Sequence, residues 1–127
     1  MIKRSFIFAL AIAAYAIPCL ALIEIKTTDE FNHSVLQSTQ PVVVRFAGGC
    51  TVCKTMDGTY EEIAKTQAVN YTFAAVNIDK SPDLAKSNDI SAIPSFLFFK
   101  NGKKVGQVIG RVAKEKLEKD MKHAFSK

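Results

Sequence analysis

Residues 76–111 read VNIDKSPDLAKSNDISAIPSFLFFKNGKKVGQVIGR, and this stretch carries most of the information about the fold. Near its end, two runs rich in aromatic and β-branched residues span 95–100 and 103–110. They are separated by Asn101 and Gly102, the dipeptide that a two-residue hairpin turn prefers. The pattern therefore predicts two antiparallel strands joined by a tight turn.

The same stretch begins with the end of another apolar run, residues 71–79. Ser81 and Pro82 follow, which is a typical helix start with proline at the first helical position. A short helix is expected to continue to about Ser87, before the Ile93-Pro94 dipeptide that leads into the hairpin.

The rest of the chain extends this pattern in both directions. Thr27 and Glu30 resemble a capping box that starts a helix ending near Gln37. The other expected elements are strands at 22–26 and 41–47 and helices at 51–67 and 114–125. The order β-α-β-α-β-α-β-β-α predicts a single α/β domain with a central mixed sheet and helices on both faces.

The first residues have the pattern of a secretory signal peptide. Lys3 and Arg4 precede an uncharged, mostly apolar run over residues 5–23, and small residues suit cleavage after Ala21. We therefore expect a signal peptide at residues 1–21 and a mature domain at 22–127. The protein would be exported to a periplasm or to the secretory or extracellular space.

Two alternatives concern the same segment. The uncharged run is just long enough to span a bilayer, so residues 1–21 are also compatible with an uncleaved anchor, the only case in which membrane attachment is expected. Cys19 is a weaker candidate for lipid modification, because Pro18 is an unfavourable neighbour.

Charge argues against a nucleic-acid partner. The net charge is +5, and it falls to +3 without the basic residues of the signal. So small a charge, spread along the chain, is typical of a solvated surface.

The segment GGCTVCK, residues 48–54, is expected to carry the chemistry. Cys50 falls at the start of a predicted helix and Cys53 lies one turn later. Unpaired N–H groups and the helix dipole favour a thiolate at Cys50, lowering its pKa below the usual value of about 8.5. This makes Cys50 the nucleophile and Cys53 the thiol that resolves a mixed disulfide.

A Cys-x-x-Cys pair by itself also fits a metal clip, a soft-metal carrier loop or a structural disulfide. A zinc site needs more ligands, and the only histidines, His33 and His123, fall in helices expected elsewhere. A structural disulfide that closes so short a loop restricts the unfolded chain only a little and therefore adds little stability. No metal and no other cofactor is expected.

Residues 22–127 resemble the thioredoxin family, most closely over 76–111 and at the two cysteines. The resemblance implies a thioredoxin-like fold and a thiol–disulfide oxidoreductase that acts on protein thiols and disulfides as a monomer, with an upstream redox partner. It also implies a cis Pro94 beside the cysteines and a substrate surface formed by Gly49, Ile93 and Pro94. The alternative is a non-catalytic module that binds an extended peptide. The two residues between the cysteines, Thr51 and Val52, do not show whether the protein acts as a reductant, an oxidant or an isomerase.

Three positions depart from the family. Gly49 replaces a Trp before the first cysteine, and an ungapped comparison places Val44 and Ala75 where the family has a buried Asp and its Lys partner. Without this Asp and its Lys partner, proton transfer at Cys53 should be slower, and so should the reduction of substrate disulfides. Arg45 is expected to pack its stem and extend its head to solvent or a carboxylate; the alternatives are an approach to the cysteines and a one-residue gap that places it at the Asp position.

Overall fold

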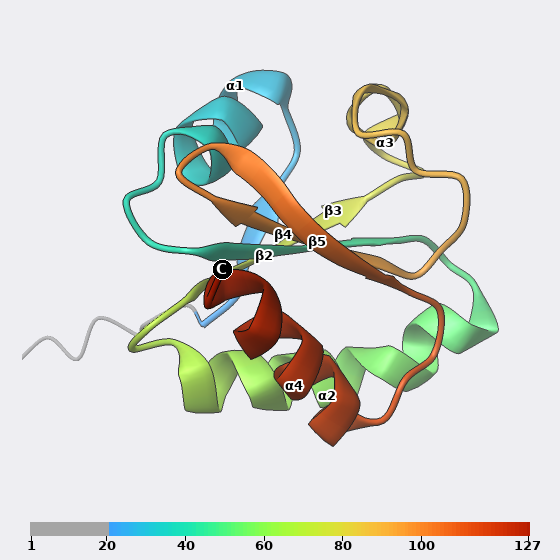
Figure 1. Cartoon of the computed structure of the whole chain (residues 1–127). Coiled ribbons are helices and arrows are strands. Elements are labelled where there is room, and N and C mark those ends of the chain that lie inside the picture. The colour runs from blue at the N-terminus through green and yellow to red at the C-terminus, as the bar shows by residue number, and fades with distance from the viewer. Residues whose placement is uncertain (1–20) are drawn as a thin grey trace, which may run out of the picture.

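The computed structural model describes residues 21–127, a central sheet between two layers of helices (Figure 1). The expected signal peptide, apart from Ala21, lies outside the described residues. The elements follow the expected order. They are β1 (Ile23–Ile25), α1 (Thr28–Phe31), a π-helical turn η1 (Asn32–Leu36), β2 (Val42–Ala47), α2 (Thr51–Gln67), β3 (Thr72–Asn77), α3 (Pro82–Ser87), β4 (Ser95–Lys100), β5 (Lys103–Ile109) and α4 (Lys114–Phe125).

The five strands form one mixed sheet in the order β1-β3-β2-β4-β5. Strands β1, β3 and β2 are parallel, whereas β4 runs antiparallel to β2 and β5 antiparallel to β4. This confirms the predicted fold class. Strand β2 lies at the centre, and the chain leaves its carboxyl end directly into the segment that holds the cysteines.

Each face of the sheet has its own hydrophobic core. Helices α2 and α4 cover one face, and α1, η1 and α3 cover the other (Figure 1). Because side chains alternate along a strand, neighbouring residues of β2 belong to different cores. Val43 packs against α2 and α4, while Val44 packs on the α1 and α3 side. Both are buried.

The hairpin turn forms where the sequence predicts it. Asn101 and Gly102 have φ angles of 52° and 77°, the positive values that a type I′ turn requires. A Cβ on Gly102 would lie 2.7 Å from the carbonyl oxygen of Leu36, so the turn packs closely against η1. Glycine is therefore needed here both for the backbone conformation and for space.

The two predicted helix starts differ in detail. Thr27 accepts a hydrogen bond from the N–H of Glu30 at 3.1 Å, as a cap should. Ser81 precedes α3 as expected, but its hydroxyl donates to the carbonyl oxygen of Lys26 at 2.8 Å and caps no helix N–H. It joins the start of α3 to the end of β1 instead.

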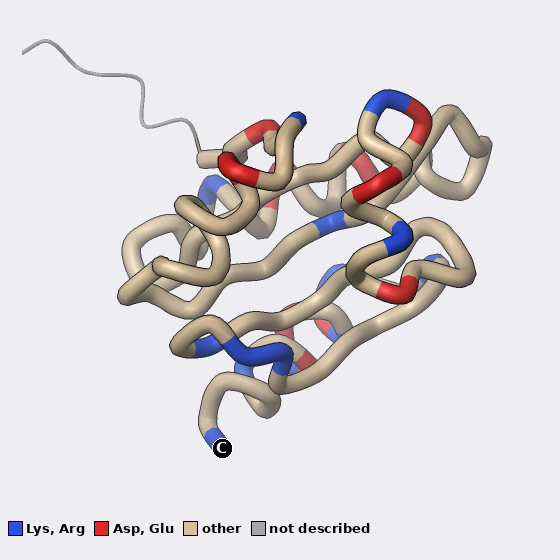
Figure 2. The backbone as a smooth tube through the Cα atoms, turned by 90° about the horizontal axis from the view of Figure 1, so that it is seen from above, with Lys and Arg blue, Asp and Glu red and all other residues tan. Residues whose placement is uncertain are grey.

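Basic residues gather at one end of the molecule. Figure 2 shows them at the turn between β4 and β5, close to the C-terminus. There Lys100 donates to the carbonyl oxygen of Phe125 at 3.0 Å. This is the end of the sheet opposite the cysteines, because β4 is antiparallel to β2. Within residues 21–127, no helix is both long and apolar enough to cross a membrane.

Candidate active site

Cys50 caps the amino end of α2, as predicted. Its backbone is extended, with φ −73° and ψ 151°, and its sulfur accepts the N–H of Cys53 at 3.0 Å. The two cysteines form a disulfide with an S–S distance of 2.11 Å and Cα atoms 5.1 Å apart. The sulfur of Cys50 thus takes the place of the side-chain oxygen that usually satisfies a helix N–H.

The two sulfurs differ in access to solvent. Cys50 lies half-buried at the helix start, whereas Cys53 is only 1% exposed and belongs to the buried face of α2. An incoming sulfur can therefore meet Cys50 first. The sulfur of Cys53 is shielded from solvent and is bonded to the sulfur of Cys50.

Gly48 and Gly49 connect β2 to this helix, and they differ in the space available for a side chain. The N–H of Gly49 donates to the Asp79 carboxylate at 3.2 Å. A Cβ on Gly48 would lie 2.9 Å from the same carboxylate, while one on Gly49 would meet no described atom within 4 Å. A side chain at position 48 would therefore need the Asp79 carboxylate to move, whereas the space beside Gly49 is open.

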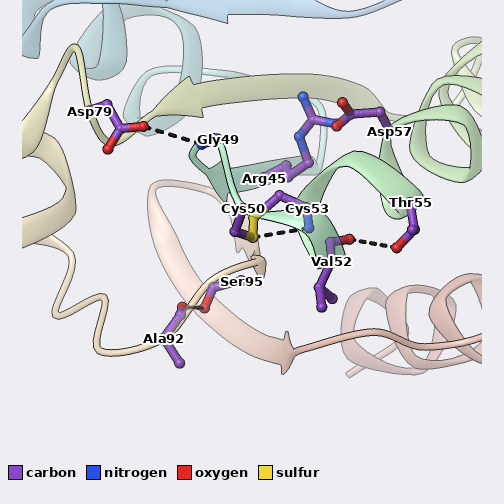
Figure 3. Close-up of a disulfide and its surroundings, with 10 residues drawn as sticks. All are labelled: Arg45, Gly49, Cys50, Val52, Cys53, Thr55, Asp57, Asp79, Ala92 and Ser95. Carbon is purple, nitrogen blue, oxygen red and sulfur yellow. Dashed lines mark hydrogen bonds and ion pairs between the residues drawn. A yellow bond between two sulfur atoms is a disulfide. The ribbon is translucent and has the colours of Figure 1, made fainter.

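The Ile93–Pro94 peptide bond is cis, as the resemblance implies. The β2–β4 register pairs Phe46 with Ser95, so the loop before Ser95 lies at the same end of the sheet as Cys50 (Figure 3). The carbonyl oxygen of Pro94 accepts the N–H of Gly110 at 2.8 Å. This hydrogen bond holds the loop against the chain that leaves β5.

Arg45 lies on β2, and its side chain runs along α2 to the carboxylate of Asp57 (Figure 3). The Nη1–Oδ1 distance is 2.5 Å, and the guanidinium carbon lies 5.1 Å from the centre of the Tyr60 ring. The Arg45 side chain is 15% exposed and that of Asp57 is 48% exposed. The predicted arrangement, a packed stem with its head on a carboxylate, is confirmed.

A cleft of about 310 Å³ opens beside this ion pair. Its lining combines residues from β1, β2, β3 and α2 with Gly48, which leads to the cysteines. The charged side chains that line it are Glu24, Arg45 and Asp57. Solvent therefore reaches the carboxylate of the pair, while the arginine stem stays packed.

Tyr60 fastens α2 to the sheet. Its hydroxyl lies 3.0 Å from the carbonyl oxygen of Val43 and 2.7 Å from that of Ala74, and it donates to this pair of oxygens on β2 and β3. The side chain is 0% exposed. Burial raises the pKa of Tyr60 well above its usual value, more than the nearby Arg45 lowers it, so the hydroxyl stays neutral.

The thioredoxin family model matches residues 22–123. The chain belongs to the thioredoxin family. It is 35% identical to thioredoxin of Mycobacterium tuberculosis over 99 residues, which cover 76% of this chain and 85% of that protein. It is 37% identical to thioredoxin of Alicyclobacillus acidocaldarius over 92 residues, covering 72% and 88%.

A solved structure gives the same result. The chain superposes on thioredoxin of Malassezia sympodialis with a TM-score of 0.74 and 30% identity, covering 81% of this chain and 90% of that one. Family membership and the Cys50–Cys53 disulfide together show a thiol–disulfide oxidoreductase that acts on protein thiols and disulfides.

The strand register bears on which residue of β2 corresponds to the family's buried Asp. Ala75 pairs across the sheet with Arg45, whereas Val44 pairs with Ala74. Val44 points to the opposite face, into the core under α1 and α3. Since the family's Asp and Lys are partners on neighbouring strands, the residue opposite Ala75 takes the Asp position. This pairing favours the register with a one-residue gap, in which Arg45 takes the Asp position.

The sequence analysis did not identify Asp57 and Tyr60 as the contacts of Arg45. A signal was available, because a charged Arg45 in a buried strand needs a carboxylate, and Asp57 follows Cys53 by four residues.

Metal binding has no support in the described part of the chain. Among residues 21–127, no three His, Cys, Asp or Glu side chains lie close enough together to hold an ion. The two cysteines are joined to each other instead.

Proposed function

We propose that this oxidoreductase is exported and that its disulfide exchange begins at Cys50 and is completed by Cys53. The observation that carries the assignment of roles is the difference in burial between the two sulfurs. Cys50 is half-buried at a helix start, and Cys53 is 1% exposed. A thiolate at Cys50 is also stabilised by the N–H of Cys53 and by the helix dipole.

In the reducing direction, the Cys50 thiolate attacks one sulfur of a substrate disulfide. A mixed disulfide forms, and the other substrate sulfur leaves as a thiolate that takes up a proton. Cys53 loses its proton and attacks the Cys50 sulfur. This forms the Cys50–Cys53 disulfide and releases the second substrate thiolate. The substrate gains two electrons and the protein loses two, so a dithiol donor must reduce it again.

Substrate is proposed to lie across Gly49 and the Ile93–Pro94 loop. The loop lies at the same sheet end as Cys50, and its Ile93 side chain is part-exposed. The family usually has a Trp at the position of Gly49. Here the space beside Gly49 is open, which leaves room for a bulky side chain of the substrate. An extended segment is favoured because its backbone can pair with the loop.

A trapping experiment tests the roles. In a Cys19→Ser background, reduced Cys53→Ser and Cys50→Ser chains are mixed with a model protein disulfide such as insulin. Cys53→Ser is expected to accumulate a mixed disulfide on a non-reducing gel, because the resolving thiol is missing. Cys50→Ser is expected to accumulate far less, because its remaining thiol is buried. The reverse pattern would overturn the assignment.

Export rests on residues 1–21, with Lys3 and Arg4 before an uncharged run. We place the mature protein in a periplasm or in the secretory or extracellular space. Expression of the full chain in a Gram-negative host should give a periplasmic protein that starts at Leu22. An intact chain in the cytosol would contradict export, and an intact chain in the membrane fraction would contradict cleavage.

The working form is proposed to be a monomer with a separate two-electron donor. Within residues 21–127, the exposed large apolar side chains come from β1, η1, α2, the turn after α2 and β5: Ile23, Leu36, Val52, Val69 and Ile109. Light scattering behind gel filtration should give the mass of one chain at micromolar concentration. A dimer mass would contradict this.

A further inference from the structure

The ion pair of Arg45 and Asp57 lies beside the redox centre. Asp57 follows Cys53 by four residues on α2, so the two side chains are neighbours one helical turn apart. Arg45 reaches Asp57 from β2, and the same strand continues through Gly48 to Cys50. Figure 3 shows the pair along the helix that holds both cysteines.

We propose that this pair sets the balance between the disulfide and the thiolate at the cysteines, with Arg45 and Asp57 shifting it in opposite directions. Both act as positioning residues, because their charges influence the sulfurs without entering the reaction. The inference rests on the proposed function, since it requires that the Cys50–Cys53 pair cycles between two redox states.

The physical argument is one of charge. Two-electron reduction opens the disulfide and leaves a thiolate at Cys50, so the reduced state carries one more negative charge near the helix start. A nearby cation stabilises that state, and a nearby anion destabilises it. Because the Arg45 side chain is 15% exposed, solvent screens its charge less than that of a surface lysine. Paired with Asp57, its effect is largely cancelled.

The contacts of Arg45 show that it is held in place. Its guanidinium carbon lies 5.1 Å from the centre of the Tyr60 ring, and Tyr60 is itself tied to β2 and β3. Its Nε is buried with no hydrogen-bond partner among residues 21–127. The guanidinium therefore depends on one carboxylate, and loss of that carboxylate leaves a nearly intact positive charge beside the redox centre.

Other charged groups surround the site and stay constant between variants. Glu24 lines the same cleft, Asp79 accepts the N–H of Gly49, and Lys54 follows Cys53 on the exposed side of α2. Their contribution cancels when variants of the pair are compared with the unaltered protein.

The test is an equilibrium with graded glutathione buffers. The redox state of the Cys50–Cys53 peptide in the full chain is read by differential alkylation and mass spectrometry, so Cys19 is not counted. Arg45→Met should favour the disulfide about tenfold, and Asp57→Asn should disfavour it by a similar factor. Tenfold corresponds to about 30 mV for a two-electron couple. The pKa of Cys50 should rise in the first variant and fall in the second.

Three further variants separate this effect from general damage. Arg45→Lys keeps the charge and should stay near the unaltered protein, and the double variant Arg45→Met/Asp57→Asn should return toward it. Glu62→Gln removes the same charge from α2, where Glu62 pairs with Lys114 at 2.8 Å, and should shift nothing. If Arg45→Met fails to fold, Asp57→Asn decides the question, because its side chain is half-exposed.

The outcomes distinguish the two proposals. If the unaltered Cys50–Cys53 pair shows no reversible transition, the proposed redox cycle fails. If it titrates normally but the Arg45 and Asp57 variants shift together or not at all, only the role of the ion pair is overturned. A shift with Glu62→Gln as large as that with Asp57→Asn would also overturn it, because net charge alone would then explain the effect.

Discussion

The backbone N–H of Cys53 points at the sulfur of Cys50, 3.0 Å away. This contact places the first cysteine at the positive end of α2. The N–H and the dipole stabilise a negative sulfur more than a neutral one. The reactivity of Cys50 therefore depends on where the helix begins.

The first prediction concerns the acidity of Cys50. In the reduced protein its thiol pKa should lie below the free value of about 8.5, because only the thiolate gains from the helix start. Alkylation rate against pH, resolved by peptide, measures it for each cysteine. Since Cys53 is buried, its thiol should titrate at higher pH. Equal values for the two cysteines would contradict this account of the site.

The second prediction separates the two glycines. Gly48→Ala should lower the free energy of unfolding by about 1 kcal/mol, because the new methyl group makes the exposed Asp79 side chain turn away and costs its hydrogen bond to the N–H of Gly49. Gly49→Ala serves as the matched control and should be neutral or stabilise by up to about 1 kcal/mol, because its φ is not positive and its surroundings are open. Urea denaturation measures both. Equal losses at the two positions would show that the connection is strained throughout.

The third prediction uses the buried hydroxyl of Tyr60. Its folded pKa is raised, whereas the unfolded value is about 10, so above that pH only the unfolded chain loses the proton. Stability should then fall as pH rises above 10. Tyr60→Phe should cost about 1–2 kcal/mol at neutral pH through lost hydrogen bonds. It should also show a shallower alkaline decline than the unaltered protein, measured by urea denaturation across that range. Parallel declines would contradict the assignment.

The fourth prediction tests the register of β2. Val44→Asp places a carboxylate in the core under α1 and α3, where Val44 is 0% exposed. It should destabilise the fold by about 3 kcal/mol or more, because burial of an unpaired charge is costly. Arg45→Met should cost less, since it leaves an apolar side chain of similar length in a mostly buried place and buries no new charge. If Val44→Asp were well tolerated and sped up disulfide reduction, the ungapped comparison would be right after all.

Much of the fold could be predicted from local patterns. Asn101-Gly102 marks the hairpin turn, and both residues adopt the positive φ angles that the dipeptide favours. Helix α4 spans the predicted residues, Lys114–Phe125, because its apolar residues repeat at helical spacing. The cysteine pair at a strand-to-helix junction was also evident. Each of these signals lies within a few residues of the feature it specifies.

The ion pair could not be located in the same way. Arg45 and Asp57 lie twelve residues apart on different elements, and their contact exists only once α2 packs on the sheet. The face to which Arg45 points depends on strand register, and a one-residue shift moves a side chain to the other face. An ungapped comparison therefore matches Val44 and Ala75 to a pair of partners, although Val44 pairs with Ala74 and lies in the other core.

The sequence by itself determined the order of elements, the hairpin turn and the cysteine pair at the start of a helix. The tertiary structure decided which residues of β2 face α2, and it decided that Arg45 is paired with Asp57. The reason is physical. Backbone preferences and side-chain periodicity act between chain neighbours, whereas the burial and pairing of a charge depend on what the folded protein places beside it.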